Sequence, residues 1–331
     1  MLPCPSTDPA AHGEFPGLSM FVLGIDAGGS KTVCLLSDGD GEVRRSARGP
    51  GANLAVLGEL EVEKVLYELM EQVLTDERSG PAAAICLGIA GVDRAEDAAV
   101  IRGILRRIGQ KAPVLVVNDA LIALEAGAGG GPGIVIIAGT GSICYGRNEK
   151  GQAARAGGWG YILADEGSGW WIGQRAIMAV MRQFDGRGPA TALTPRVLAH
   201  FGVAEPFQLV YEVYYRDTRR RLIASLSEAV RTSADEGDPV AREIIAGAAA
   251  ELVVGVRSVA ERLEMRGGQF PLVLAGSIFR VLPALKADVI ERVAEVVPRS
   301  QPRMLDAEPA LGAVRLALAE ARGGARLPVY I

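Results

Sequence analysis

The sequence is poor in histidine and in clustered positive charge, and each shortage argues against one class of site or partner. Only His12 and His200 occur among 331 residues. Neither lies near a glycine-rich turn, so we predict no histidine general base and no histidine-ligated metal. The formal net charge is −4 and no run of Lys and Arg stands out, which argues against a nucleic-acid partner. No apolar run approaches the roughly 18 residues of a membrane span, so no membrane partner is predicted.

The cysteines are few and scattered. Cys4, Cys34, Cys86 and Cys144 form no C-x-x-C pair. This spacing predicts reduced thiols in a cytoplasmic protein rather than a disulfide framework or a zinc site. Residues 1–19 contain four prolines and lack the basic-then-apolar layout of a signal peptide, so we expect them to form a disordered extension.

Two common nucleotide-binding signatures are missing, but a different glycine-rich turn is present. Neither G-x-x-x-x-G-K-[ST] nor G-x-G-x-x-G occurs in the chain. Residues 21–32, FVLGIDAGGSKT, instead predict a buried strand, a turn of small residues and a second strand. Glycines let backbone N–H groups approach an anion, and hydroxyls and a lysine add donors.

The chemistry of this turn suits phosphate and a metal ion. The predicted phosphate ligands are Gly28, Gly29, Ser30, Lys31 and Thr32. Which of the last three contacts phosphate stays open. Asp26, where the strand ends, supplies a carboxylate suited to Mg²⁺, directly or through water. The alternative is an ordinary glycine hairpin with polar tips.

Predicted strands and helices alternate in an order that occurs twice. The first 128 residues give the order βββαβαβα, and GGGPG at 129–133 is a plausible break. AGTGS at 138–142 then repeats the small turn between apolar strands, and helices are expected at about 168–183, 206–216, 222–232 and 239–265. The alternation indicates an α/β fold with helices on the faces of a sheet. The repeat favours a duplication over coincidental glycine turns.

The duplication predicts two lobes that hold a nucleotide between them. We expect an N-terminal lobe over 20–130 and a C-terminal lobe over 131–314. A helical segment of about 315–331 could return to the first lobe.

Several motifs, taken in order, carry a resemblance to a known family. They are GIDAGGSKT (24–32), GANLA (51–55), LGIAGV (87–92), VVNDA (116–120), IIAGTGS (136–142), GGWGYILADEGS (157–168), LAGSIF (274–279) and EPALGAV (308–314). The chain resembles the N-acetylglucosamine kinases within the BadF/BadG/BcrA/BcrD ATPase family, in the actin, hsp70 and hexokinase superfamily. The resemblance implies two duplicated actin-like, ribonuclease H-like ATPase lobes with a nucleotide cleft between them.

The same resemblance implies roles for further residues. Asp119 would be the general base that accepts a proton from a sugar hydroxyl. The ATP-binding set would add Gly139, Thr140, Gly141, Gly276, Ser277 and Gly312. The sugar-binding set would be Asn53, Gly158, Trp159, Gly160, Asp165 and Glu166.

Each of these assignments has a structural alternative. Asn118 and Asp119 could merely cap the next helix. Asp165 and Glu166 could complement a helix dipole, and the glycines could simply allow close packing.

The implied activity is that of a cytoplasmic kinase using ATP and Mg²⁺. Its substrate would be a hydroxyl, expected to be O6, of an amino sugar such as N-acetylglucosamine, and the family suggests a homodimer. Which sugar is phosphorylated stays open. The alternative is an ATPase that activates a redox enzyme, a 2-hydroxyacyl-CoA dehydratase or benzoyl-CoA reductase, through an iron–sulfur cluster held between subunits. Cys86 and Cys144 do not lie in plausible cluster loops, and the GGWG to DEGS segment suits a sugar better.

Overall fold

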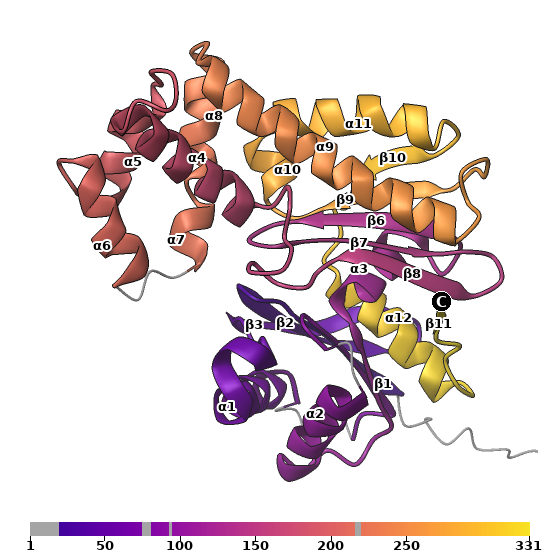
Figure 1. Cartoon of the computed structure of the whole chain (residues 1–331). Helices are drawn as coiled ribbons and strands as arrows, with labels where there is room; N and C mark the ends of the chain where they lie inside the picture. Colours follow the sequence, from indigo (N-terminus) through magenta and orange to yellow (C-terminus); the bar gives the residue numbers. More distant parts are fainter. Residues whose placement is uncertain (1–19, 75–80, 93–94, 216–219) are drawn as a thin grey trace, which may run out of the picture.

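The computed structural model describes residues 20–74, 81–92, 95–215 and 220–331 (Figure 1). Within these ranges the strands form two sheets, and helices cover the sheet faces. No described helix has the length and apolar character needed to cross a bilayer. The extension predicted over residues 1–19 lies outside the described residues.

The first sheet has the strand order β3-β2-β1-β4-β5. β1 pairs antiparallel with β2 and parallel with β4, and β4 pairs parallel with β5. The apolar run of β1 is buried from Val22 onward because helices cover both faces of this sheet. The elements of this part are β1 (Phe21–Ala27), β2 (Lys31–Asp38), β3 (Val43–Pro50), α1 (Leu54–Leu74), β4 (Ala84–Ile89), α2 (Ala95–Arg107), β5 (Val114–Asn118) and α3 (Asp119–Ala128).

The second sheet repeats this arrangement. Its order is β10-β9-β6-β7-β8-β11, in which β6, β7, β8, β9 and β10 take the places and directions of β1 to β5. The predicted α/β fold with two duplicated lobes is therefore confirmed. Its strands are β6 (Gly133–Ala138), β7 (Ser142–Arg147), β8 (Gln152–Gly157), β9 (Pro271–Ala275), β10 (Gln301–Met304) and the short β11 (Val329–Tyr330), which adds to β8.

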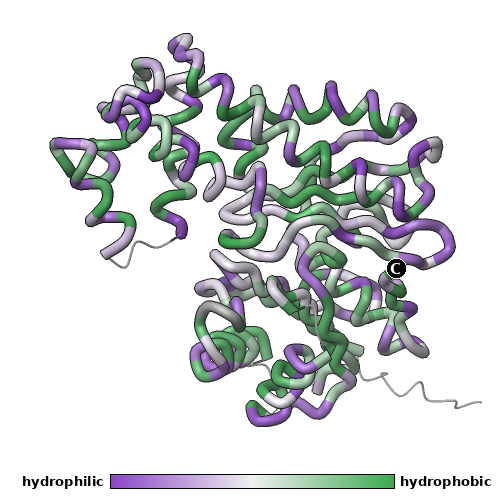
Figure 2. The backbone as a smooth tube through the Cα atoms, viewed as in Figure 1, coloured by the Kyte–Doolittle hydropathy of each residue, from purple (hydrophilic) through white to green (hydrophobic). Residues whose placement is uncertain are grey.

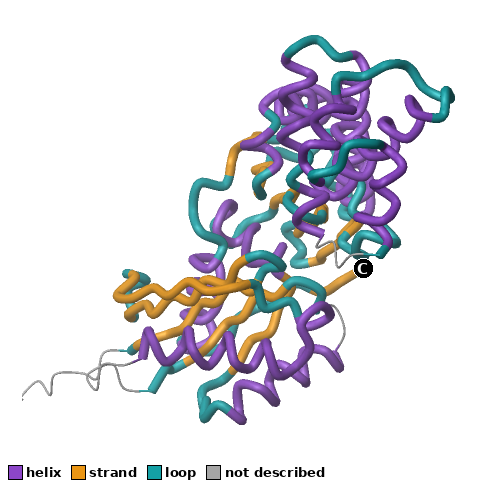
Figure 3. The backbone as a smooth tube through the Cα atoms, turned by 90° about the vertical axis from the view of Figure 1, so that its left-hand side faces the viewer, coloured by secondary structure: helices purple, strands orange, loops and turns teal. Residues whose placement is uncertain are grey.

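A long helical stretch separates β8 from β9. Figure 1 shows most of its helices at the upper left, and in Figure 3, where that side faces the viewer, a group of helices fills the upper end of the molecule. They are α4 (Gly169–Phe184), α5 (Leu193–Phe201), the short 3₁₀ helix η2 (Pro206–Gln208), α6 (Leu209–Tyr214), α7 (Arg220–Ala224), α8 (Ser227–Asp235) and α9 (Pro239–Arg262). We call α4 to α8 the helical insert. After β9 come α10 (Ile278–Val281), α11 (Pro283–Val296) and α12 (Ala310–Ala321).

The core consists of three apolar clusters in layers. One lies between the first sheet and α1 and α2, and another between the second sheet and the helices of its outer face. The third fills the space between the two sheets, where α3 and α12 pack side by side (Figure 1). Figure 2 shows the apolar residues concentrated along the strands and the helix sides that face them.

The chain crosses between the two sheets three times, the last time from α12 to β11, which pairs with β8 of the second sheet. The first crossing follows α3 and leads into β6, and the second leads from β10 to α12. Helix α12 packs on the first sheet from its first residue, Ala310. It approaches β1 so closely that a Cβ added at Gly24 would lie 2.6 Å from the Ala310 carbonyl oxygen. The predicted lobe boundaries near 130 and 314 stay predictions.

Candidate active site

The turn between β1 and β2 is the first predicted phosphate loop. The Gly28 N–H donates to the Lys31 carbonyl over 3.0 Å, which closes the turn. Gly51 lies so close that a Cβ there would be 2.6 Å from the Gly29 carbonyl oxygen, so the segment after β3 supports the turn. Gly29, Ser30 and Lys31 stay exposed, and their donors can meet a ligand.

The side chain of Thr32, one of the predicted phosphate ligands, is turned inward, and its contact with phosphate stays a prediction. It is fully buried, and its hydroxyl donates to the Pro50 carbonyl over 2.8 Å. Side chains alternate along a strand, and the exposed Lys31 at the start of β2 puts Thr32 on the inner face. The Thr32 hydroxyl therefore ties β2 to β3.

The second predicted phosphate loop, residues 139–141, joins β6 to β7 and rests on the first turn of α4. The Gly169 N–H donates to the Gly139 carbonyl over 2.9 Å, and the Trp170 N–H donates to the Thr140 carbonyl over 3.2 Å. The first amides of a helix lack intrahelical acceptors, and here the loop carbonyls supply them. The loop is thereby fixed to the helical insert.

The two loops meet across the sheets. Ser30 Oγ lies 3.5 Å from Thr140 Oγ1, although 110 residues separate them. Lys31 Nζ lies 3.0 Å from Glu308 Oε2, and Arg48 pairs with the other oxygen of Glu308 at 2.7 Å. Hydroxyls and a cation from separate halves of the chain thus gather at one place, as a phosphate site requires.

Two carboxylates flank this place. Asp26 is 8% exposed near the end of β1, and Asp119 follows β5, two strands away in the same sheet. The pKa of Asp26 is raised to about 7, mainly by burial. The negative charges of Asp119 and Glu308 also raise this pKa, whereas the positive charge of Lys31 lowers it. A buried carboxylate that faces a second carboxylate is best compensated by a cation, so the surroundings of Asp26 fit a divalent metal ion.

The helix after β5 is capped by Asn118 and not by Asp119. Asn118 is extended at φ −66° and ψ 143°, and its Oδ1 accepts the Ala120 N–H at 2.9 Å. Asp119 is the first residue of α3 and is half-buried. Asn118 therefore fills the capping function, so capping of α3 does not account for an aspartate at position 119.

Asn53, one of the predicted sugar ligands, has an unsatisfied hydrogen-bond acceptor. Its Oδ1 is buried and has no hydrogen-bond partner among the described residues. A Cβ at Gly91 would lie 3.6 Å from its Nδ2, so the Asn53 amide faces the turn after β4. A buried polar atom without a partner costs free energy unless a ligand or water supplies one. This supports Asn53 as a ligand-binding residue.

Asp165 is held inside the protein. It is 3% exposed at φ +69°, and it accepts the Ser142 N–H at 3.1 Å and Arg220 Nη2 at 2.8 Å. Burial raises its pKa, and the hydrogen bond from Ser142 and the Arg220 charge work against that rise. These contacts tie the predicted sugar loop to β7 and to α7.

Gly158, Trp159, Gly160 and Glu166, also predicted to bind the sugar, lie in the same loop as Asp165. The side chains of Trp159 and Glu166 are more exposed than that of Asp165. Gly158 and Gly160 have positive φ values of 75° and 85°, and Trp159 is 61% exposed beneath the Arg155 guanidinium, 3.8 Å from the ring centroid. Glu166 is exposed, and its carbonyl accepts the Ser142 hydroxyl at 2.7 Å. Their contact with a sugar stays a prediction.

The two glycines predicted to lie near adenosine are both closely packed against other backbone. A Cβ at Gly276, where φ is +102°, would lie 2.2 Å from the Ala138 carbonyl oxygen, and the neighbouring Ser277 is exposed. A Cβ at Gly312 would lie 1.9 Å from the Ile122 carbonyl oxygen. Gly312 is buried where α12 packs on α3, and its place near the nucleotide stays a prediction.

We predict that Gly312→Ala destabilises the protein by at least about 2 kcal/mol, because the added methyl must separate two packed helices. The measurement is the midpoint of denaturant unfolding. Gly103→Ala is the matched control, since a Cβ there meets only Arg107 Nη1 at 3.8 Å. That control should stabilise α2 by about 0.5–1 kcal/mol. Equal stability of both variants would contradict the packing role of Gly312.

Sequence reasoning missed three charged residues at this place. Glu308 stands in the quoted EPALGAV motif, but its contact with Lys31 spans 277 residues. Arg220 and Arg221 lie in α7, just before the start of the helix expected over 222–232, and Arg221 Nη2 donates to the Gly29 carbonyl at 2.9 Å. Only the charge of these side chains could have pointed to them.

The arrangement agrees with comparisons to known proteins. Residues 23–317 match the BadF/BadG/BcrA/BcrD ATPase family. The chain belongs to this family. An N-acetylmuramic acid/N-acetylglucosamine kinase of Clostridium acetobutylicum is 37% identical over 303 residues, covering 91% of this chain and 99% of that protein. An N-acetyl-D-glucosamine kinase of Dictyostelium discoideum is 31% identical, covering 89% of this chain and 97% of that protein.

Solved structures of the family support the same fold. A candidate N-acetylglucosamine kinase of Chromobacterium violaceum superposes with a TM-score of 0.71 at 26% identity, covering 91% of this chain and 99% of that one. Family members of this type thus share the duplicated lobes over nearly their whole length. The predicted resemblance is confirmed.

Proposed function

We propose that this protein is an ATP-dependent kinase that phosphorylates O6 of an amino sugar of the N-acetylglucosamine type. The observation that carries the proposal is the meeting of the two phosphate loops beside Asp26 and Asp119, in a chain whose curated relatives are kinases of such sugars. Phosphoryl transfer needs mainly positioning and charge neutralisation, and the residues gathered here can supply both.

The roles follow from the geometry. The exposed turn at Gly29 and Ser30 and the hydroxyl of Thr140 would bind the phosphates of ATP through N–H and O–H donors. Asn53 Oδ1 would accept a hydrogen bond from a sugar hydroxyl. Asp119 would accept the proton of the attacking hydroxyl, for which a carboxylate within hydrogen-bond reach is sufficient.

Mg²⁺ would enter with ATP. The described residues contain no group of three or more His, Cys, Asp and Glu side chains able to hold a metal alone. Mg²⁺ in such enzymes is held by one or two carboxylates together with the substrate phosphates and water. Asp26 would be that carboxylate, and the ion supplies neutralisation of the phosphate charge.

The redox-activator alternative is less well supported. Cys34, Cys86 and Cys144 are buried in the sheets, and burial raises the pKa of the Cys34 thiol to about 12 and those of the other two further. A cluster shared between subunits needs thiolates at a surface. None of the cysteines within the described ranges offers one.

The assembly and location are proposals of the same kind. We expect a homodimer in the cytoplasm, in keeping with the family resemblance and with the thiol spacing. The exposed aromatic residues of η2 and α6, Phe207, Tyr211 and Tyr214, supply one apolar surface for such a contact.

The test is a panel of sugars with ATP·Mg²⁺, followed by ADP release and by NMR of the phosphorylated product. We expect N-acetylglucosamine to exceed glucose in kcat/KM by at least roughly 10-fold, because a pocket that hydrogen-bonds the 2-substituent rejects a sugar without it. N-acetylmuramic acid and glucosamine define the tolerance of that pocket. No ADP release above the sugar-free rate with any of the four would refute the kinase assignment.

A further inference from the structure

The short helix α7 is fixed to the second phosphate loop through α4. A Cβ at Gly173 of α4 would lie 1.9 Å from the Ile223 carbonyl oxygen, so the two helices are in backbone contact. Ile223 is 2% exposed. Since the first amide of α4 binds the Gly139 carbonyl, α7, α4 and the loop form one packed unit. Figure 1 shows α7 at the end of the helical insert that faces the first sheet.

Two consecutive arginines of α7 contact the two sides of the candidate active site. Arg220 pairs with Asp165 of the predicted sugar loop at 2.8 Å and lies over the Tyr161 ring. Arg221 donates to the Gly29 carbonyl of the first phosphate loop at 2.9 Å. Because consecutive Cα atoms are about 3.8 Å apart, α7 links the predicted sugar loop to the first phosphate loop through these two side chains. A phosphoryl group that moves from the first phosphate loop to a sugar bound at Asp165 would pass close to this helix.

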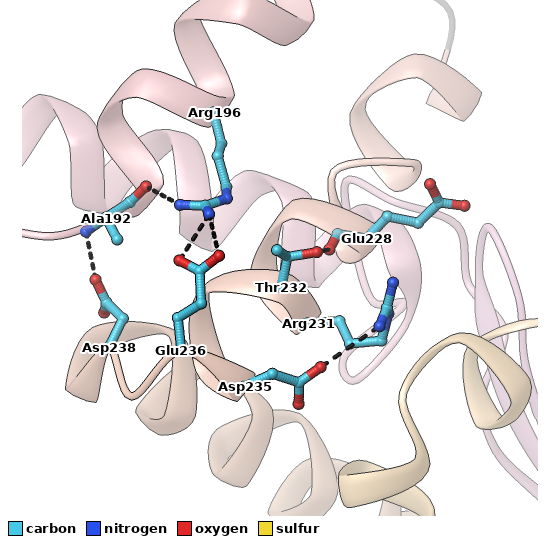
Figure 4. A network of polar contacts seen from close by, with 8 residues as sticks. All are labelled: Ala192, Arg196, Glu228, Arg231, Thr232, Asp235, Glu236 and Asp238. Carbon is cyan, nitrogen blue, oxygen red and sulfur yellow. Dashed lines mark hydrogen bonds and ion pairs between the residues drawn. The ribbon is translucent and has the colours of Figure 1, made fainter.

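The guanidinium of Arg221 has donors to spare. It carries five N–H groups, and in the described part of the chain one of them is bonded, to Gly29, while no carboxylate lies in ion-pair range. The other cation of the loop, Lys31, is paired with Glu308. Two other arginines of the helical insert are paired with carboxylates, Arg196 with Glu236 and Arg231 with Asp235 (Figure 4). An anion that enters beside Gly29 would therefore meet an unneutralised charge.

We propose that Arg221 contacts the terminal phosphoryl group of ATP and stabilises the charge on it during transfer. This rests on the proposed kinase function. In the step, the bond between the γ-phosphorus and the β–γ bridging oxygen breaks and ADP leaves with that electron pair. The sugar oxygen forms the new bond to phosphorus, and its proton passes to Asp119. A guanidinium fixed at the equatorial oxygens acts where the charge is spread.

The test compares Arg221→Gln and Arg221→Lys with the control Arg231→Gln. Arg231 is on the same insert and pairs with Asp235 at 3.4 Å, away from both loops. We expect Arg221→Gln to lower kcat by on the order of 10², with the KM for sugar within a few-fold. Arg221→Lys should recover part of the loss because it keeps the charge, and the control should behave as wild type.

The affinities for two nucleotides distinguish a contact of Arg221 with the terminal phosphate from a purely structural role in joining α7 to the Gly29 loop. A group that touches only the terminal phosphate changes binding of the β,γ-imido analogue of ATP and leaves ADP binding alone. We expect the ratio of the two affinities to fall about 10-fold in Arg221→Gln. Equal losses for both nucleotides, or a kcat within 3-fold of the control, would overturn the proposal. If wild type phosphorylates no sugar, the kinase assignment fails separately, and the affinity ratio still decides the role of Arg221.

Discussion

Asp119→Asn is expected to lower turnover by on the order of 10²–10⁴ while the fold and the binding of ATP and sugar change little. A positioned acid–base group contributes this much to a rate. Asparagine has almost the same shape as aspartate and still forms hydrogen bonds, but it cannot take up the proton of the attacking hydroxyl. Loss of kcat with binding kept marks an interaction made mainly in the transition state. Steady-state kinetics with saturating ATP·Mg²⁺ and sugar measure it.

The structure sharpens this test by assigning the helix cap to Asn118. Its Oδ1 accepts the Ala120 N–H, so Asn118→Ala should reduce stability by about 1 kcal/mol. Asp119→Asn should not reduce it, because Asp119 lies inside the helix. Turnover close to wild type in Asp119→Asn would exclude Asp119 as the base. Asp165 would then be the remaining carboxylate of the predicted sugar loop, although its contacts with Arg220 and Ser142 already occupy it.

The fold could be predicted because its signals are local and repeated. Apolar runs such as 21–25 and 134–137 are bounded by glycine and small residues, and such runs predict buried strands wherever they occur. Their repetition in the same order predicts the duplication. Sequence gave no such signal for α5, over Leu193–Phe201, whose N-terminus has no side-chain cap and whose first turn contains Pro195. The expected helix over 206–216 is instead split into η2 and α6.

The parts of the candidate site that lie within a single loop could be predicted from the sequence. The contacts between segments far apart in the sequence could not. The glycine turns at 28–29 and 139–141 identify themselves by composition. The partners of Lys31 and Gly29, namely Glu308 and Arg221, are 277 and 192 residues away. Only the packing of α12 and α7 brings them there. The burial of Thr32 also depends on a partner outside its own turn, since its hydroxyl donates to the Pro50 carbonyl, 18 residues away.

A second large effect is expected at Asp26, where one substitution should change stability and activity in opposite directions. Asp26→Asn should make the nucleotide-free protein more stable at pH 8. Burial and the nearby Asp119 hold the pKa of Asp26 at about 7, against about 3.8 in the unfolded chain. Between these values the folded protein keeps a proton that the unfolded chain has released. Stability therefore falls as the pH rises through this window.

The size of the effect follows from the same linkage. Below pH 3.8 the Asp26 carboxyl is neutral in the folded and the unfolded protein, so it does not reduce the free energy of unfolding. Above pH 7 it is charged in both states, and the reduction in the free energy of unfolding reaches its limit of about 4 kcal/mol. The advantage of Asp26→Asn over wild type should therefore grow by roughly 2–3 kcal/mol between pH 5 and pH 8. Denaturant unfolding in metal-free buffer measures it. Asp40→Asn, at an exposed turn, is the control and should show no such growth.

Activity should move the other way. If Asp26 holds the Mg²⁺ of ATP·Mg²⁺, its replacement removes a ligand of the ion that neutralises the phosphates. We expect kcat/KM for ATP·Mg²⁺ to fall by on the order of 10³. Wild type should gain thermal stability from ADP with Mg²⁺, because the ion favours the charged carboxylate, and Asp26→Asn should lose most of that gain. A variant that is less stable than wild type at pH 8, or that keeps full activity, would contradict the account.

The two substitutions also test each other. Because the charge of Asp119 raises the pKa of Asp26, Asp119→Asn should lower that pKa and reduce the stability gained on replacing Asp26. The double variant should then be less stable than the sum of the two single effects predicts, by an amount that grows with pH. Additive stabilities at pH 8 would mean that the two carboxylates do not interact. A shared site for metal and proton transfer would then lose its main electrostatic support.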